Sequence, residues 1–489
     1  MENISKIIKR ITESGLILTS DGFEYIKTID SRRLDEIIDF VIQEAQRENV
    51  YYIDESFLGK FFEEREPIKE IEKGWDKRYE RIKPEIIYSL HPEPLGEVEG
   101  FLQYFKSRYN KISKLFRMRG DLNGIVKTGE ISKLPMKTRF KIIGMVGELV
   151  VRGRRLYLDL EDDEGSITII TADDDVFRKG LMLLKDQVVC VDAIKLREDL
   201  FIAKDFIWPD IATKVNNRAD RRVFAVFISD LHVGSIHFLE DLFNNFIKWL
   251  NGGFGSEFHK ELASRVRYLV IAGDIVDGIG VYPNQINELE IRDLYEQYET
   301  AAKLLSKIPR HIEIIIIPGN HDAVAKALPQ PPIPEEYAKE LHMDERIHIL
   351  SNPSYISLEG VEVLICHGKA LDDILSSKPG LDFQHPAKGM ELLLRCRHLA
   401  PIYGATTPIA PEREDRLVIE RVPDILHMGH VHIHQIRRYR GVTLIASGSW
   451  QSQTSYQRRL DIKPTPGIAT VVDLSSLQTY TMDFKALSG

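Results

Sequence analysis

Six short apolar runs in the second half of the chain constrain its fold. Each run follows Arg222, is four to seven residues long and is succeeded by a polar cluster, often with a helical pattern after it. The runs lie in the segments VFAVFISDLHVGS, RYLVIAGDIVDG, IEIIIIPGNHD, VEVLICHGKA, DILHMGHVH and VTLIASGSW. Uninterrupted apolar strands of this length are typical of a layered α/β sheet that is buried on both faces. Because functional sites in such sheets gather just beyond strand ends, we expect a site there.

The first five runs each end in side chains that are able to bind a metal ion. These are Asp230 and His232, Asp274, Asn320 with His321 and Asp322, His367, and finally His430 and His432. A single fragment of this kind arises by chance, and a lone strand-end histidine is more often a hydrogen-bonded core residue, but five in order are hard to explain that way. Imidazole, carboxylate and amide donors favour manganese, iron or zinc over calcium. The number of donors predicts two divalent cations, with Mn²⁺ preferred and Fe or Zn as alternatives.

The ordered motifs DxH, GDxxD, GNHD, CHG and GHVH resemble those of the calcineurin-like metallophosphoesterases. The resemblance implies that one cation is held by Asp230, His232 and His432, that the other is held by Asn320, His367 and His430, and that Asp274 bridges the two. It also implies that His321 is a catalytic residue beside the scissile phosphate and that Asp322 orients it. Two adjacent cations activate water and neutralise phosphoryl charge, and a histidine assists the leaving oxygen. Asp277 is a candidate supporting residue, and His434 is interpreted as structural.

The chain before these motifs divides into three further parts. Residues 1–50 have apolar residues at helical spacing and predict a small helical N-terminal module. Residues 51–130 are rich in charge and proline and predict a linker with partial helix. Residues 131–212 contain about five short alternating runs, which predict an OB-type β-barrel, with an arbitrary β-rich domain as the alternative. The phosphoesterase domain is expected over 220–489, so the predicted fold is multidomain.

A barrel ahead of a phosphoesterase domain, together with the segments FISDLHVGS and LLLRCRHLAPIYGATTPIAPE, resembles the small subunit of archaeal family D DNA polymerase. The family implies a metal-dependent 3′ to 5′ exodeoxyribonuclease that proofreads for a large catalytic polymerase subunit. Its expected partners are that subunit, DNA with a 3′ end, the sliding clamp and other replication proteins. Eukaryotic relatives have lost metal ligands and act as scaffolds, whereas this chain keeps all seven positions.

Composition limits the alternatives. A net charge of −9 argues against a free-standing duplex binder with a broadly basic surface, so a local groove or a partner would have to hold DNA. No apolar stretch is long enough to span a bilayer, and the start of the chain lacks a secretory signal, which together predict a cytoplasmic protein without membrane partners. The three cysteines, without a CxxC pair, support neither disulfides nor a thiolate zinc site. Two other functions remain open: a phosphoesterase for phosphoproteins or cyclic diesters, and a scaffold whose metal site is structural.

Overall fold

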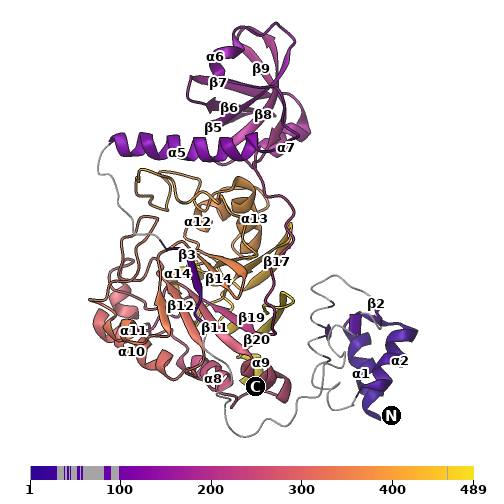
Figure 1. The fold of residues 1–489 in the computed structure, drawn as a ribbon, viewed down its shortest axis with the longest axis vertical. Coiled ribbons are helices and arrows are strands. Elements are labelled where there is room, and N and C mark those ends of the chain that lie inside the picture. The colour runs from indigo at the N-terminus through magenta and orange to yellow at the C-terminus, as the bar shows by residue number, and fades with distance from the viewer. Residues whose placement is uncertain are drawn as a thin grey trace. The chain divides into compact units, whose positions relative to one another are not determined.

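The computed structural model describes residues 2–29, isolated positions and short stretches between 38 and 58, residues 82–89, and residues 98–459 and 461–488 (Figure 1). The chain forms two compact units. The first comprises residues 1–80 and 252–264, and the second comprises residues 81–251 and 265–489. The predicted barrel and the predicted metal-binding motifs therefore belong to the same unit.

The first unit contains helices and a short strand pair. Its described elements are α1 (Glu2–Glu13), β1 (Ile17–Leu18), α2 (Ser20–Thr28), β2 (Tyr52–Ile53) and α9 (Glu257–Ser264). The Thr19 hydroxyl caps α2 by accepting the Gly22 N–H. The apolar side chains of α1 and α2, together with Ile53, share one buried cluster. Strands β1 and β2 pair in parallel, a feature that helical spacing alone did not predict.

The second unit contains a closed five-stranded β-barrel, in the segment where short strands were predicted. Its strands are β5 (Arg139–Arg152), β6 (Arg155–Glu161), β7 (Ser166–Thr171), β8 (Val188–Arg197) and β9 (Leu200–Ile207), with α7 (Asp174–Gly180) between β7 and β8. The order β5-β6-β7-β9-β8 closes because β8 also pairs with β5. Alternating residues of β6 and β7 are buried, which explains the two-residue period of their sequences, whereas the first six residues of β8 are all buried. The short strand β4 (Ile125–Val126) adds to β5, and α6 (Thr128–Ile131) follows it.

The rest of the second unit is built on two six-stranded sheets. One has the order β13-β12-β11-β10-β19-β20 and the other has the order β17-β18-β16-β15-β14-β3. The first sheet comprises β10 (Phe224–Ile228), β11 (Val266–Ala272), β12 (Glu313–Ile317), β13 (Ile347–Ile349), β19 (Ile468–Asp473) and β20 (Gln478–Asp483). The second comprises β3 (Glu85–Ser89), β14 (Ser354–Leu358), β15 (Val361–Ile365), β16 (Ile425–Met428), β17 (Gln435–Tyr439) and β18 (Val442–Ala446). All six apolar runs are thus strands: β10, β11 and β12 are parallel neighbours in one sheet, and β15, β16 and β18 in the other.

One buried apolar cluster contains side chains from both sheets, including Phe227 and Val270 from the first and Val363 and Ile445 from the second. On its other side the second sheet contacts α12 (Leu371–Leu375) and α13 (Pro386–Cys396), whose leucines pack against Leu364. The remaining helices of this unit are α8 (Glu240–Leu250), α10 (Leu294–Ser306), α11 (Lys339–Met343) and α14 (Ser455–Arg459). Strands covered in this way must be apolar on both faces, which explains the uninterrupted runs.

The segment predicted as a linker with partial helix contains strand β3 and helix α5 (Val98–Arg117), in addition to β4 and the start of α6, and all of these belong to the second unit. Strand β3 pairs antiparallel with β14 at the edge of the second sheet. Helix α5 buries Tyr104, Arg108, Ile112 and Phe116, which are four residues apart and so form one face. Partial helix was expected in this segment, whereas strand β3 was not predicted.

A fully buried arginine on α5 connects the barrel to the α/β part of the unit, and α5 lies between them (Figure 1). Arg108 Nε donates to Asp415 Oδ2 at 2.7 Å, and its terminal nitrogens donate to the carbonyls of Asp186 and Pro401. His398 Nε2 lies 2.8 Å from the same Asp415 oxygen. Burial alone would raise the pKa of Asp415, but His398 and Arg108 hold it well below its ordinary value.

The described part of the chain contains no helix that is both long and apolar enough to cross a membrane. Cys190, Cys366 and Cys396 are buried free thiols, and burial raises the pKa of each to about 12. None of the three is a reactive thiolate at neutral pH.

Replacing the buried arginine should destabilise the second unit. Arg108→Leu leaves the Asp415 carboxylate buried without its cation, and breaking a buried pair in this way costs about 3–5 kcal/mol. The matched control is Arg178→Leu, because Arg178 pairs with Asp175 on the exposed surface of α7 and such pairs contribute about 0–1 kcal/mol. Calorimetry of the full-length variants should show a much lower melting temperature only for Arg108→Leu. Equal melting temperatures for the two variants would contradict the role given to Arg108.

Candidate metal centre

The polar residues that follow the strands meet at one place. Asp230 and His232 follow β10, Asp274 follows β11, Asn320 follows β12, His367 follows β15, and His430 and His432 follow β16. The possible ligand atoms of Asp230, His232 and His432 lie within 4.8 Å of one another, as do those of Asp274, His367 and His430. Asn320 Oδ1 lies 3.1 Å from His367 Nε2. All seven predicted metal-binding residues therefore form two adjoining clusters.

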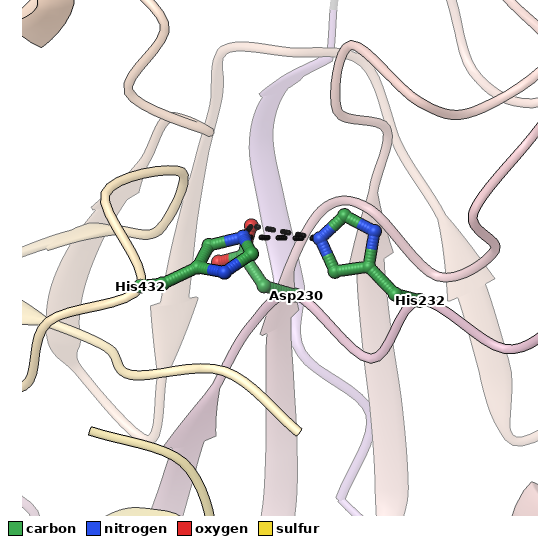
Figure 2. Close-up of side chains that lie close together, drawn as sticks. All are labelled: Asp230, His232 and His432. Carbon is green, nitrogen blue, oxygen red and sulfur yellow. Dashed lines mark hydrogen bonds and ion pairs between the residues drawn. The ribbon is translucent and has the colours of Figure 1, made fainter. Parts of the chain in front are cut away.

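The first cluster places two imidazoles against one carboxylate (Figure 2). Asp230 Oδ1 is 3.3 Å from His432 Nε2 and 3.9 Å from His232 Nε2, and the two Nε2 atoms are 3.0 Å apart. This carboxylate oxygen is buried and accepts no hydrogen bond from the described part of the chain. A buried carboxylate oxygen in that situation is costly unless a cation compensates it. The donor set and this oxygen fit a divalent cation.

The second cluster shares a carboxylate with the first. Asp274 Oδ2 is 3.2 Å from His367 Nε2 and 3.9 Å from His232 Nε2, so it faces both clusters. The other carboxylate oxygen, Oδ1, accepts the His321 N–H at 2.7 Å. Asp274 therefore occupies the position that a bridging ligand requires.

His430 has a carboxylate partner that the motifs did not reveal. Its Nε2 lies 3.0 Å from Asp372 Oδ2, which also accepts from Lys369 at 2.6 Å. Burial alone would raise the pKa of Asp372, but the facing His430 and Lys369 lower it. With Nε2 engaged, Nδ1 is the ring nitrogen of His430 that remains for a cation. The adjacent Asp373 accepts hydrogen bonds from Thr406 and Thr407, which fixes this end of α12.

The other ligand histidines are oriented through Nδ1, which leaves Nε2 facing the site. His232 Nδ1 bonds Asp277 Oδ1 at 3.0 Å, His367 Nδ1 donates to the Ala272 carbonyl at 2.8 Å, and His432 Nδ1 lies 2.7 Å from Gln457 Nε2. Gln285 and Gln451 in turn donate to the Asp277 carboxylate. Partners of this kind fix ring orientation and tune ligand basicity. Sequence analysis suggested Asp277 and missed the three glutamines, which carry no recognisable motif.

Five of the seven ligand candidates have left-handed backbone. The φ angles are 56° for Asp230, 54° for His232, 53° for Asp274, 69° for His430 and 63° for His432. Such conformations cost of order 1–3 kcal/mol each in residues with side chains and concentrate at functional sites. The backbone is therefore bent to direct these side chains into the centre.

Two motif glycines are required by close approach. A Cβ on Gly319 would lie 2.2 Å from Asp274 Oδ1, and one on Gly429 would lie 1.8 Å from Ser229 Oγ and 2.5 Å from Asp230 Oδ2. Any larger residue would displace the carboxylates, which explains why glycine stands in GNHD and GHVH.

The charges of the centre are strongly perturbed. Burial alone would raise the pKa of Asp230 and Asp274, but His432 beside Asp230 and His367 beside Asp274 lower both. Conversely, burial alone would lower the pKa of His367, and the Asp274 carboxylate raises it to about 9. Burial instead lowers the pKa of His432, so the two carboxylates do not have equivalent imidazole partners.

The two predicted catalytic residues lie beside the clusters but do not contact each other as expected. A ring nitrogen of His321 lies within 4.8 Å of ligand atoms of His232 and Asp274, while His321 Nδ1 lies 2.7 Å from the Asp277 carbonyl oxygen. A carbonyl only accepts, so Nδ1 carries a proton and Nε2 is the nitrogen that remains. The buried Asp322 carboxylate instead accepts from the Gly319 N–H at 2.8 Å and from the Tyr298 hydroxyl at 3.1 Å. The ring of His321 is therefore oriented by the Asp277 carbonyl, and Asp322 holds the GNHD loop.

His434, interpreted as structural, lies outside both clusters. Its Nε2 is 3.0 Å from the Thr470 hydroxyl, and its N–H donates to the Thr465 hydroxyl at 2.6 Å. It therefore contributes hydrogen bonds between loops and no ligand atom.

Comparison with known proteins identifies the family. Residues 225–436 match the family of the B subunits of DNA polymerases alpha and epsilon. The DNA polymerase II small subunit of Methanothermobacter thermautotrophicus is 45% identical over 381 residues, which are 77% of this chain and 78% of that protein. The proteins of the same name from Archaeoglobus fulgidus and Pyrococcus horikoshii are 44% identical over 378 residues and 40% identical over 422 residues, covering 77% and 85% of this chain and 75% and 68% of theirs. The chain therefore belongs to the archaeal DNA polymerase II small-subunit family, the family D small subunit that its motifs predicted.

Proposed function

We propose that the chain is a 3′ to 5′ exonuclease that proofreads for a replicative DNA polymerase by two-metal hydrolysis of phosphodiesters. The observation that supports this most directly is the pair of adjoining clusters, with Asp274 facing both and with Asp230 Oδ1 accepting no hydrogen bond from the residues that the structure describes. Residue roles follow the family motifs: Asp230, His232 and His432 for one cation, Asn320, His367 and His430 for the other. Mn²⁺ is the proposed metal, with Fe or Zn as alternatives.

Bound divalent cations would supply an activated water and would neutralise charge on the phosphoryl oxygens. The residues of this chain supply the geometry. Asp277 and Asp372 hold His232 and His430 in fixed orientations, so the donor atoms need no rearrangement before substrate binds. His321, whose Nδ1–H is held by the Asp277 carbonyl, keeps Nε2 free for the substrate. Nε2 can donate to the leaving oxygen only when the ring is the doubly protonated imidazolium, so this role requires that a proton reach Nε2 when the phosphate binds.

A scaffold with a structural metal is the less favoured alternative. A structural site is normally closed by its ligands, and it needs no additional imidazole beside them. Here His321 adjoins both clusters and lines a pocket, which a structural site would not require. A phosphoesterase for phosphoproteins or cyclic diesters is disfavoured by the family to which the chain belongs.

The parts of the fold have corresponding proposed roles. We assign the two-sheet region to the calcineurin-like metallophosphoesterase fold and the five-stranded barrel to the OB type. The N-terminal unit, expected to be a helical module, is proposed as a docking element. The relatives are named small subunits, so we propose a large catalytic polymerase subunit as partner and the sliding clamp as a further one.

Asp274→Asn should abolish hydrolysis and lower the metal content of the purified chain. The substitution removes the charge that both cations share, and a neutral amide does not replace a bridging carboxylate. The matched control is Asp382→Asn, because Asp382 is exposed and pairs with nearby His385. Metal content by mass spectrometry and Mn²⁺-dependent digestion of a 5′-labelled strand are the measurements. Full activity of Asp274→Asn would rule out the two-metal assignment.

His321→Ala should separate chemistry from metal binding. Assistance to a leaving oxygen is worth about 10²–10⁴-fold, so single-turnover cleavage should fall by that factor while both cations stay bound. His385→Ala, which changes an exposed histidine, is the control. Because His321 lies within ligand distance of Asp274, loss of one cation from His321→Ala would identify it as a ligand and refute the role proposed here.

The chain should copurify with a larger polymerase subunit from its native cells. An affinity tag on the chain and mass spectrometry of the eluate test this, with the Arg108→Leu variant showing whether an intact second unit is needed. Recovery of the chain alone, with processive digestion of DNA at physiological salt, would contradict the subunit assignment, since the net charge of −9 disfavours unaided DNA binding.

A further inference from the structure

A pocket of about 410 Å³ opens beside His321, whose Nδ1 is held by the Asp277 carbonyl. Its size falls within the range of small-molecule sites, about 300–1,000 Å³. The walls are formed by the GNHD loop after His321, the start of α10 and the proline-rich segment that follows the loop. The residues that matter for the argument are Ile279, Leu294, Pro331, Pro334 and Tyr337, with Lys326 at one edge.

The apolar wall is suited to a flat ring. Tyr337 is backed by Tyr295, with ring centroids 5.6 Å apart and planes tilted by 35°. Ile279 and Tyr295 remain 45% and 52% exposed, although both are large apolar side chains next to a polar centre. Aromatic and aliphatic walls bind nucleobases of any sequence by stacking, because every base has a π-face.

The polar edge is suited to a phosphate. His321 borders the pocket and both metal clusters at once, and the Lys326 ammonium donates to the carbonyl of Asn320, the proposed ligand next to His321. A ligand with a flat apolar ring and an anionic group a short distance away satisfies both edges. Beyond Pro334 the chain continues with Glu335 and Glu336, both exposed, whose charge opposes a second phosphate on that side.

We propose that this pocket holds the base of the 3′-terminal nucleotide while its phosphate lies at the metal centre. The inference rests on the proposed exonuclease function and adds to it the reason why the site acts on strand ends. A pocket for one base, with Pro334 in its wall and the exposed Glu335 and Glu336 next in the chain, accepts a terminus and disfavours a strand that continues. Because recognition is by stacking, all four bases are accepted, as proofreading requires.

The binding test uses single-stranded DNA that carries 2-aminopurine, a base whose fluorescence is quenched by stacking. The full-length chain is titrated in EDTA with the probe base at the 3′ end or at an internal position. The terminal probe should be quenched and the internal one unchanged, and dAMP should reverse the quenching. Tyr337→Ala should abolish it, whereas Tyr157→Ala, a half-buried tyrosine of barrel strand β6, should behave as the unmodified chain.

The kinetic test compares Mn²⁺-dependent removal of a normal 3′ nucleotide with that of a 3′ abasic residue. Stacking should favour the normal end by about 5- to 150-fold, and Tyr337→Ala should bring this ratio toward one. Ile279→Ser changes an exposed residue on another wall of the pocket and should lower the ratio of normal to abasic cleavage by a smaller factor. This second variant keeps the test decisive if Tyr337→Ala fails to fold.

Several outcomes would overturn the pocket assignment. They are equal quenching of terminal and internal probes, an unchanged ratio in both variants, or displacement of the probe by a phosphotyrosine peptide but not by dAMP. If the unmodified chain digests DNA from its 3′ end but removes normal and abasic ends at nearly the same rate, the pocket assignment is refuted while the proposed exonuclease function stands. Failure of the unmodified chain to cleave either DNA or bis(4-nitrophenyl) phosphate would refute the proposed function, whereas the EDTA titration would still decide whether the pocket binds a terminal base.

Discussion

Two buried carboxylates, Asp230 and Asp274, impose the condition on which the rest of the centre depends. Both are almost fully inaccessible to water. The charged partners that lower their pKa values are imidazoles, chiefly His432 for Asp230 and His367 for Asp274, rather than lysine or arginine side chains. Negative charge in such a place must be compensated locally, or the fold would be more stable without it. Histidines meet this condition in two ways, because they can carry protons or release them to cations. The proposed cations would compensate both carboxylates at once.

The fold makes this arrangement possible by geometry alone. Parallel strands within each sheet end at a common edge, so residues that follow different strands meet without long excursions. Left-handed φ angles at Asp230, Asp274 and His430 then turn the side chains inward. Neighbouring glycines such as Gly429 allow the loops to come close enough. The strain is concentrated in the loops, while the strands themselves are regular.

The strands and the ligand candidates were predictable because each depends on local sequence. A short apolar run, such as the four isoleucines that end strand β12 (Glu313–Ile317), predicts a buried strand. The polar residues that follow such a run predict where the site lies. The barrel strands were predictable from their two-residue alternation. Family motifs then gave an expected role to each ligand candidate.

Other features were not predictable, because they depend on contacts between distant segments. Asp372 meets His430 from 58 residues away, and Gln451 meets Asp277 from 174 residues away, with no motif on either. The contacts of Asp322 were hidden for the same reason, since its proximity in sequence to His321 says nothing about which oxygen that ring contacts. Strand β3 was not predicted, because its place in the second sheet depends on pairing with β14, which follows much later in the chain.

The hydrogen bonds of one loop link the barrel to the second metal cluster mechanically. Arg108 of α5 holds residues 398–415 near both ends, through the Pro401 carbonyl and the Asp415 carboxylate. Asp373 holds the middle of this segment, through Thr406 and Thr407. Asp373 is the immediate neighbour of Asp372, which orients His430. These hydrogen bonds form a continuous path from α5, beside the barrel, to the imidazole of His430. A displacement of the barrel relative to the sheets would therefore change the orientation of His430.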